Sequence, residues 1–176
     1  MGWRGRQVRY EIFTPDRFIV GTVGAPGERA FYIQAKKEKQ IFSVAIEKDQ
    51  VRAIVARLEM IIAGIKRANP FEIADTSPVD DQPLESPVDA LFVTGAISIS
   101  WDDQVKVVVF QFYETSSQDD EEDSEVLAVS IALGAAQSFV QRSKAVVNAG
   151  RLPCPFCSIP IDPRGHLCPR ANGYKR

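Results

Sequence analysis

The residues best suited to chemistry are the cysteines and the histidine, which gather near the C-terminus. All three cysteines and the single histidine of the 176-residue chain form the pattern Cys154-x-x-Cys157 and, eight residues later, His166-x-Cys168. Thiolate and imidazole groups are ligands that Zn²⁺ prefers, and a two-residue gap containing proline makes a tight turn that aims two sulfur atoms at one point. Side chains two positions apart in an extended segment project to the same side. The spacing therefore predicts one structural zinc ion bound by Cys154, Cys157, His166 and Cys168.

This cluster has three alternative interpretations. One is that the thiols are unligated structural groups. A second is redox use, but a redox Cys-x-x-Cys pair opens a helix after a strand, whereas Cys154 follows an expected helix and Pro153. The third is a nucleobase deaminase, which needs a His-x-Glu motif upstream and leaves one zinc position to water. Because this chain has four protein ligands and no upstream histidine, we expect a structural metal.

The glycine-rich segment in the first half resembles a phosphate-binding loop only superficially. Gly21 lies within a strand-like segment, and Gly24 and Gly27 lie between it and the next strand, whereas a phosphate loop runs from a strand into a helix N-terminus. Pro26 and Gly27 fit the two central positions of a type II turn, so we expect a hairpin. No Ser-His-Asp or Cys-His arrangement is indicated, because the sole histidine already belongs to the metal-ligand cluster.

The elements that would position these residues follow from periodicity. The first helix is expected at residues 49–67, where apolar residues recur at three- and four-residue steps until Asn69-Pro70 stops the helix. A second helix is expected at residues 135–149, with Gly150 as its C-terminal cap. Runs rich in β-branched and aromatic residues predict strands at residues 8–13, 18–23, 30–35, 41–46, 91–101, 105–114 and 126–133.

The two halves of the chain resemble each other. At an offset of 74 positions Gly21 coincides with Gly95, and at an offset of 85 the apolar stripes of the two helices coincide, although amphipathic helices also align by chance. We therefore expect an α+β fold in which two βββα-like halves form antiparallel sheet with two packed helices. The core would span residues 1–150, with halves of about 1–69 and 88–150 joined by an acidic, proline-rich linker at 70–87. A zinc-binding tail would occupy residues 151–176.

Charge along the chain is basic, then acidic, then basic. Residues 1–68 carry a net charge of +6, residues 69–126 of −14 and residues 134–176 of +6, for a total of −2. The two acidic stretches, residues 70–87 and 119–125, lack the spacing of a calcium loop, so we expect solvated loops. The chain has no run of 18 apolar residues and no signal-peptide pattern at its start, which favours a cytoplasmic protein without membrane association.

Two stretches of the chain carry a resemblance to a known family. They are Phe18-x-x-Gly21-Thr22-Val23-Gly24-x-Pro26-Gly27-x-Arg29 in the first half and, at the C-terminal end, Cys154-Pro155-x-Cys157 with Pro160-x-Asp162-Pro163-x-Gly165-His166-x-Cys168-Pro169-Arg170-Ala171-Asn172-Gly173-Tyr174-x-Arg176. With this pattern the sequence resembles an uncharacterised, mainly actinobacterial family, the domain of unknown function 3090, over essentially its whole length. The resemblance implies a conserved cytoplasmic protein that is often encoded near a kinase-like protein and a histidine-phosphatase-like protein, and it implies no activity. In that family glycine often follows the Cys-x-x-Cys turn, where this chain has Ser158.

Three functions remain compatible with these features. The first is a non-enzymatic interaction or adaptor protein whose partner is another protein, with the kinase-like and phosphatase-like neighbours as candidates. The second is a nucleic-acid-binding protein, which the negative total charge disfavours. The third is an enzyme with a site between the two halves. In the first two, the surface presented to the partner would be the basic tail residues Arg164, Arg170, Tyr174, Lys175 and Arg176.

Overall fold

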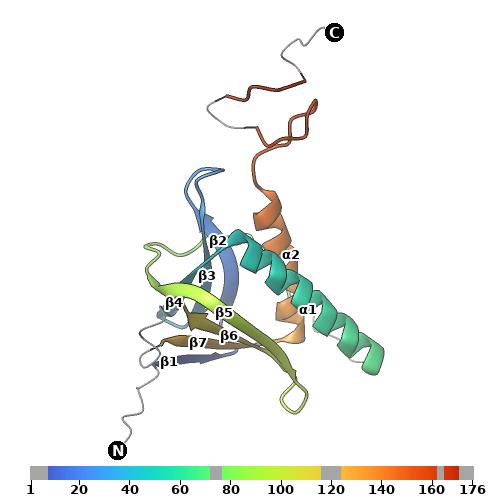
Figure 1. The fold of residues 1–176 in the computed structure, drawn as a ribbon. Coiled ribbons are helices and arrows are strands. Elements are labelled where there is room, and N and C mark those ends of the chain that lie inside the picture. Colours follow the sequence, from blue (N-terminus) through green and yellow to red (C-terminus); the bar gives the residue numbers. More distant parts are fainter. Residues whose placement is uncertain (1–7, 72–76, 116–123, 162–164, 171–176) are drawn as a thin grey trace, which may run out of the picture.

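Seven strands in one sheet and two helices build the described part of the protein in a computed structural model, which covers residues 8–71, 77–115, 124–161 and 165–170 (Figure 1). This confirms the α+β class. The strands are β1 (Arg9–Phe13), β2 (Arg17–Val23), β3 (Ala30–Lys37), β4 (Gln40–Ile46), β5 (Ala90–Asp102), β6 (Val107–Glu114) and β7 (Val126–Ala132). The helices are α1 (Lys48–Ala68) and α2 (Leu133–Asn148).

The sheet is mixed, which differs from the antiparallel sheet that we expected. Its order is β1-β7-β6-β5-β4-β3-β2. Strands β2, β3 and β4 pair antiparallel, as do β5, β6 and β7, whereas β4 pairs parallel with β5 and β1 pairs parallel with β7. The β4–β5 pair is parallel because α1 and the acidic segment carry the chain back to the end of the sheet where β4 begins.

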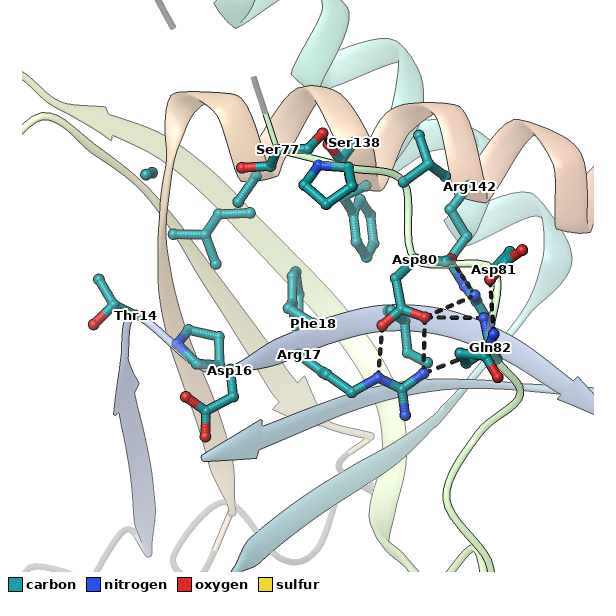
Figure 2. A pocket seen from close by; sticks show the side chains of 18 residues that line it. Thr14, Asp16, Arg17, Phe18, Ser77, Asp80, Asp81, Gln82, Ser138 and Arg142 are labelled. Carbon is teal, nitrogen blue, oxygen red and sulfur yellow. Dashed lines mark hydrogen bonds and ion pairs between the residues drawn. The ribbon is translucent and has the colours of Figure 1, made fainter. Parts of the chain in front are cut away.

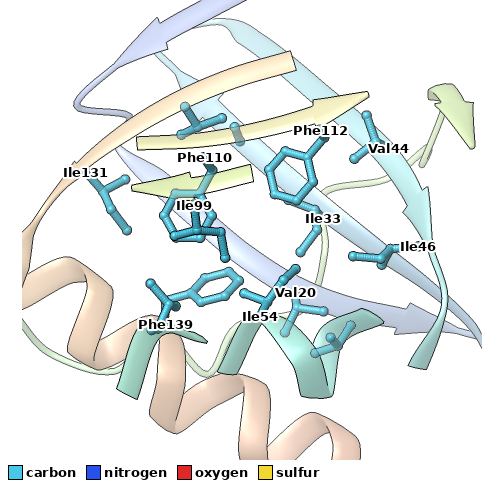
Figure 3. Close-up of a cluster of buried hydrophobic side chains, with 14 of the residues drawn as sticks. Val20, Ile33, Val44, Ile46, Ile54, Ile99, Phe110, Phe112, Ile131 and Phe139 are labelled. Atoms are coloured by element: carbon cyan, nitrogen blue, oxygen red, sulfur yellow. The ribbon is translucent and has the colours of Figure 1, made fainter. Parts of the chain in front are cut away.

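The sheet rolls strongly around its core-facing side. Three strands separate β2 from β6, yet the ring of Phe18 on β2 lies 5.0 Å from that of Phe110 on β6. Phe18 also stacks on Phe139 of α2 at 4.8 Å. On the same core-facing side, the ring of Tyr10 on β1 lies 5.6 Å from that of Phe42 on β4. Side chains from both halves consequently share one hydrophobic core (Figure 3).

The apolar stripes of the helices face this core. In α1, the predicted stripe is buried at Val51, Ile54, Val55, Leu58 and Ile65. Helix α2 buries Phe139, Val140 and Val147 and packs beside α1. The expected glycine cap of α2 is wrong, because the cap residue is Ala149 and the φ of Gly150 is not positive.

The two βββα units share strand order and strand direction. Each unit runs strand, antiparallel strand, antiparallel strand, helix, and the units meet at the β4–β5 pair. Gly21 and Gly95 have different surroundings, because Gly21 lies beneath Leu84 whereas Gly95 lies beside Thr115 at an irregularity in β5. Descent of the halves from one duplicated unit stays a prediction.

The linker is irregular, as expected, but it is not simply a solvated loop. Residues 77–87, here called the strap, run along the face of β2 and β3 that points away from the core. Leu84 is only 8% exposed, and it packs on Gly21. The Gln34 side chain donates a hydrogen bond to the Glu85 carbonyl and accepts one from the Glu85 N–H. Residues 72–76 of the linker and residues 119–123 of the second acidic stretch lie outside the described residues.

The glycine-rich segment forms the predicted hairpin between β2 and β3. The Glu28 N–H donates to the Ala25 carbonyl at 3.0 Å, which closes a four-residue turn with Pro26 and Gly27 at its centre. Gly27 has a φ of 95°, which is the left-handed conformation that the third residue of a type II turn requires. Among the described residues, no helix is long and apolar enough to cross a membrane.

The contact between Gly21 and Leu84 yields a stability prediction. A Cβ on Gly21 would lie 2.5 Å from Leu84 Cγ, so Gly21→Ala should lower the free energy of unfolding by about 1–3 kcal/mol through overpacking. Leu84→Ala should cost about 2 kcal/mol through lost burial. Because truncation of Leu84 makes room for the new methyl group, the double variant should lose clearly less than the sum in urea unfolding.

A second glycine supplies the control for this experiment. Gly64 lies on the exposed side of α1, and a Cβ there would meet nothing within 4 Å. Gly64→Ala should therefore raise the free energy of unfolding by about 1 kcal/mol through helix propensity alone. Additive losses in the Gly21/Leu84 pair would show that the strap does not press on β2.

Candidate metal centre

The first half of the metal-ligand cluster lies on a short hairpin after α2. Pro153 and Pro160 form an antiparallel bridge, and the Cys154 N–H donates to the Ile159 carbonyl at 2.9 Å. Within this hairpin the Ser158 N–H donates to the Cys154 carbonyl at 2.8 Å. Ser158 has a φ of 61°, in the left-handed region where glycine is least strained. A serine therefore stands where the local turn favours glycine.

Four ligand atoms converge at this hairpin. The Sγ atoms of Cys154 and Cys168 are 3.7 Å apart, and Cys157 Sγ lies 3.2 Å from His166 Nε2. All four ligand atoms lie within 4.8 Å of one another. Two sulfur atoms on a tetrahedral zinc ion with bonds of about 2.3 Å would be about 3.8 Å apart. The structure therefore brings the four predicted residues into an arrangement suited to a metal ion.

The electrostatics of the cysteines fit metal ligation. Cys154 and Cys168 are buried, and Cys157 and His166 are half-buried. The backbone N–H groups of Phe156 and Cys157 point at the Cys154 sulfur and lower its pKa to about 6. Burial raises the pKa of the Cys157 thiol. Cys154 is thus held as a thiolate near neutral pH, which is the form that binds metals.

The tail presents apolar side chains to solvent around this cluster. The exposed fraction is 76% for Leu152, 63% for Phe156 and 86% for Leu167, and Ile159 and Ile161 are also exposed. These side chains do not dock the tail onto the core. A hydrophobicity pattern could not distinguish them from core residues, because only the packing shows that their side chains face solvent and not the core.

One of the basic tail residues predicted to meet a partner falls in the described part of the structure. Arg170 is exposed and donates from Nη1 to the Phe156 carbonyl at 3.3 Å, which links the second half of the cluster to the hairpin. Arg164, Tyr174, Lys175 and Arg176 lie outside the described residues.

A pocket between the halves is the second candidate site (Figure 2). It has a volume of about 550 Å³ and lies between the start of β2, the strap, the end of β7 and α2. Its floor is apolar, with Phe18, Ile131 and Phe139, and its rim carries Arg17 and Asp80. The pocket lies between the two halves, where the sequence analysis expects a site if the protein is an enzyme.

The charged groups of this pocket hold the structure together. Arg17 Nε lies 2.6 Å from Asp80 Oδ2, and this hydrogen bond lowers the pKa of the Asp80 carboxyl group. Buried Arg142 of α2 donates from Nε to the Val20 carbonyl at 2.7 Å and from Nη1 to the Asp80 carbonyl. Because Arg17 keeps the Asp80 carboxylate ionised, this carboxylate is a poor proton acceptor. Its ion pair with Arg17 anchors the strap on β2. At the offset of 85 positions that relates the two helices, Arg142 corresponds to Arg57 of α1, which is exposed, so the sequence pattern does not distinguish the buried arginine from the exposed one.

Comparison with known proteins gives one match. A family model described as "Protein of unknown function (DUF3090)" matches residues 10–168, which include the strap and all four residues of the metal-ligand cluster. No curated protein and no solved structure matches the chain.

The Asp80 anchor predicts an acid-sensitive stability. Because the pKa of folded Asp80 lies below its ordinary value, its contribution is present above about pH 5 and is lost as the pH falls through the folded pKa. Asp80→Asn should lower the free energy of unfolding at pH 7 by about 1–2 kcal/mol and flatten the profile on the acid side. Urea unfolding between pH 2 and pH 7, with Asp81→Asn as the charge-matched control, measures this; equal profiles for both variants would contradict it.

Proposed function

We propose, from the premise that the chain belongs to the DUF3090 family, that it is a non-enzymatic cytoplasmic interaction protein whose tail is folded around one structural zinc ion and docks on another protein. The observation that carries this proposal is the convergence of four sulfur and nitrogen ligand atoms within 4.8 Å. The reducing cytoplasm keeps such thiols available for a metal.

The donor set favours zinc among the divalent metals. Three thiolates and one imidazole are soft and borderline ligands that suit a tetrahedral Zn²⁺ ion. Since the protein supplies all four ligands, no position is left for a substrate or a water molecule, so the ion would act in folding. A segment of this length with exposed apolar side chains cannot offset its own ordering entropy by burial. The metal would supply that free energy, on the order of 10 kcal/mol.

The surface of the tail supports a role in protein binding. Leu152, Phe156 and Leu167 each expose more than half of their surface, and they lie on one short segment that the metal would hold in place. Several large apolar side chains exposed on one short segment favour a role in protein binding. The partners that we propose to test first are the kinase-like and histidine-phosphatase-like proteins encoded near members of the family.

Metal analysis tests the zinc site. Protein purified without chelators should contain one zinc ion per chain, and Cys168→Ala should lose it because three protein ligands hold the ion far less tightly. Loss of the metal should abolish the ordered tail in hydrogen exchange but leave the urea transition of the core nearly unchanged, since the tail's apolar side chains do not pack on the core.

Ser158→Gly is the matched control within the hairpin. It relieves the left-handed strain at this position without touching a ligand, so the variant should keep its zinc. Much less than one zinc ion per chain in wild-type protein whose thiols all react freely would overturn the site.

Calorimetric titration with the two candidate partner proteins tests the docking role. At least one of them should bind the zinc-loaded protein, and Leu167→Ser should weaken that binding about tenfold without changing the zinc content, because Leu167 is 86% exposed. Met60→Ser, at an exposed apolar residue of α1, should leave the affinity unchanged. Binding that survives both Leu167→Ser and Cys168→Ala would show that the tail is not the docking element.

A further inference from the structure

A second pocket of about 550 Å³ lies at the junction of four segments that are distant in sequence. The β2–β3 hairpin contributes Gly27 and Arg29, the start of α1 contributes Lys48 and Arg52, and Arg151 follows the end of α2. Pro160 of the metal hairpin lines it as well. The pocket is separate from both candidate sites described above.

Positive charge converges in this pocket. Its lining holds four cationic side chains against one acidic residue, Glu47. A Cβ built on Gly150 would lie 3.5 Å from Lys48 Nζ and 3.7 Å from Arg29 Nη2, so these two cations border the same small space. Within the described ranges, neither Lys48 nor Arg29 forms an ion pair with a carboxylate.

The fold holds these cations in place. Lys48, Arg29 and Arg151 are half-buried, and the Arg29 guanidinium lies 5.7 Å from the centre of the Phe31 ring, in a cation–π arrangement. The Arg151 guanidinium lies directly against Gly27, where any side chain would displace it. Arg52 is exposed and already pairs with Asp49 at 2.6 Å, so its contribution is secondary. The like charges of Lys48 and Arg29, which no carboxylate of the described ranges pairs with, repel each other, and an anion would relieve that repulsion.

We propose that this basic pocket binds the phosphate group of a phosphate ester. A phosphate ester carries up to two negative charges and several acceptor oxygens, which match converging guanidinium and ammonium groups better than a single carboxylate does. The cavity volume leaves room for the organic part of the ligand beside Val147 and Pro160. The glycine-rich hairpin then serves phosphate binding through the Arg29 side chain, not through a backbone loop.

Calorimetric titration of the full chain at low ionic strength tests the pocket, with inorganic phosphate and pyrophosphate as probes and acetate as a monoanion. Pyrophosphate should bind more tightly than phosphate, and acetate should not bind. Lys48→Met should weaken pyrophosphate binding at least tenfold. Arg57→Met, which removes one positive charge from an exposed site on the same helix, should leave the affinity unchanged. Absence of pyrophosphate binding, or equal losses in both variants, would overturn the proposal.

Gly150→Asp provides an independent variant that adds a group instead of removing one. The φ of Gly150 is not positive and a Cβ there makes only ordinary contacts, so the fold should accept the change. Its carboxylate would lie beside Lys48 and Arg29 and should abolish pyrophosphate binding while the urea transition stays in place. Unchanged affinity in this variant would contradict the assigned position.

Two further probes distinguish the source of the phosphate group. Ribose 5-phosphate represents a free phosphorylated molecule, and a pentapeptide containing phosphoserine represents a phosphorylated protein chain. Tighter binding of the sugar phosphate would assign the pocket to a small molecule, and tighter binding of the peptide to a phosphorylated partner. If the unphosphorylated forms bind equally well, the phosphate group is not what the pocket recognises and the proposal fails.

Discussion

The rolled sheet closes through the ring of Phe18, and the rest of the structure depends on that closure. By reaching Phe110 across the roll and stacking on Phe139 of α2, this side chain joins the edge strand of one half to the middle strand and the helix of the other. Neither half can then bury its apolar face without its partner. A lone unit of about 60 residues has a marginal core, so one shared core is the stable solution.

The roll leaves part of the outer face of β2 and β3 to be covered, and the acidic strap does this. Leu84 fills the space above Gly21, and Arg17 and Arg142 hold the strap by its Asp80 carboxylate and backbone carbonyls. Burial of a guanidinium is costly unless its donors are satisfied, and Arg142 meets this demand with the carbonyls of Val20 and Asp80. The acidic segment therefore serves packing, although its composition is that of a solvated loop.

How much of this could be predicted depends on the range of each interaction. The strands, the apolar stripe of α1 and the turn at Pro26-Gly27 follow from neighbouring residues, and the structure has them. The metal-ligand cluster was also predictable, because residues 154–168 define its spacing locally. The parallel β4–β5 pair, the burial of Leu84 and the convergence of Lys48 with Arg29 arise between residues far apart in the chain. Local periodicity and composition do not predict contacts between such distant residues.

The position of Pro160 has a thermodynamic consequence. This residue bridges to Pro153 in the hairpin that carries Cys154 and Cys157, and it is also a wall of the basic pocket. An ion that orders the hairpin therefore shapes the pocket, and an occupant of the pocket favours the ordered hairpin. The two binding equilibria are thermodynamically linked: the factor by which the metal ion raises the affinity for the anion equals the factor by which the anion raises the affinity for the metal ion. Binding of the proposed metal ion and binding of the proposed phosphate ester would therefore strengthen each other.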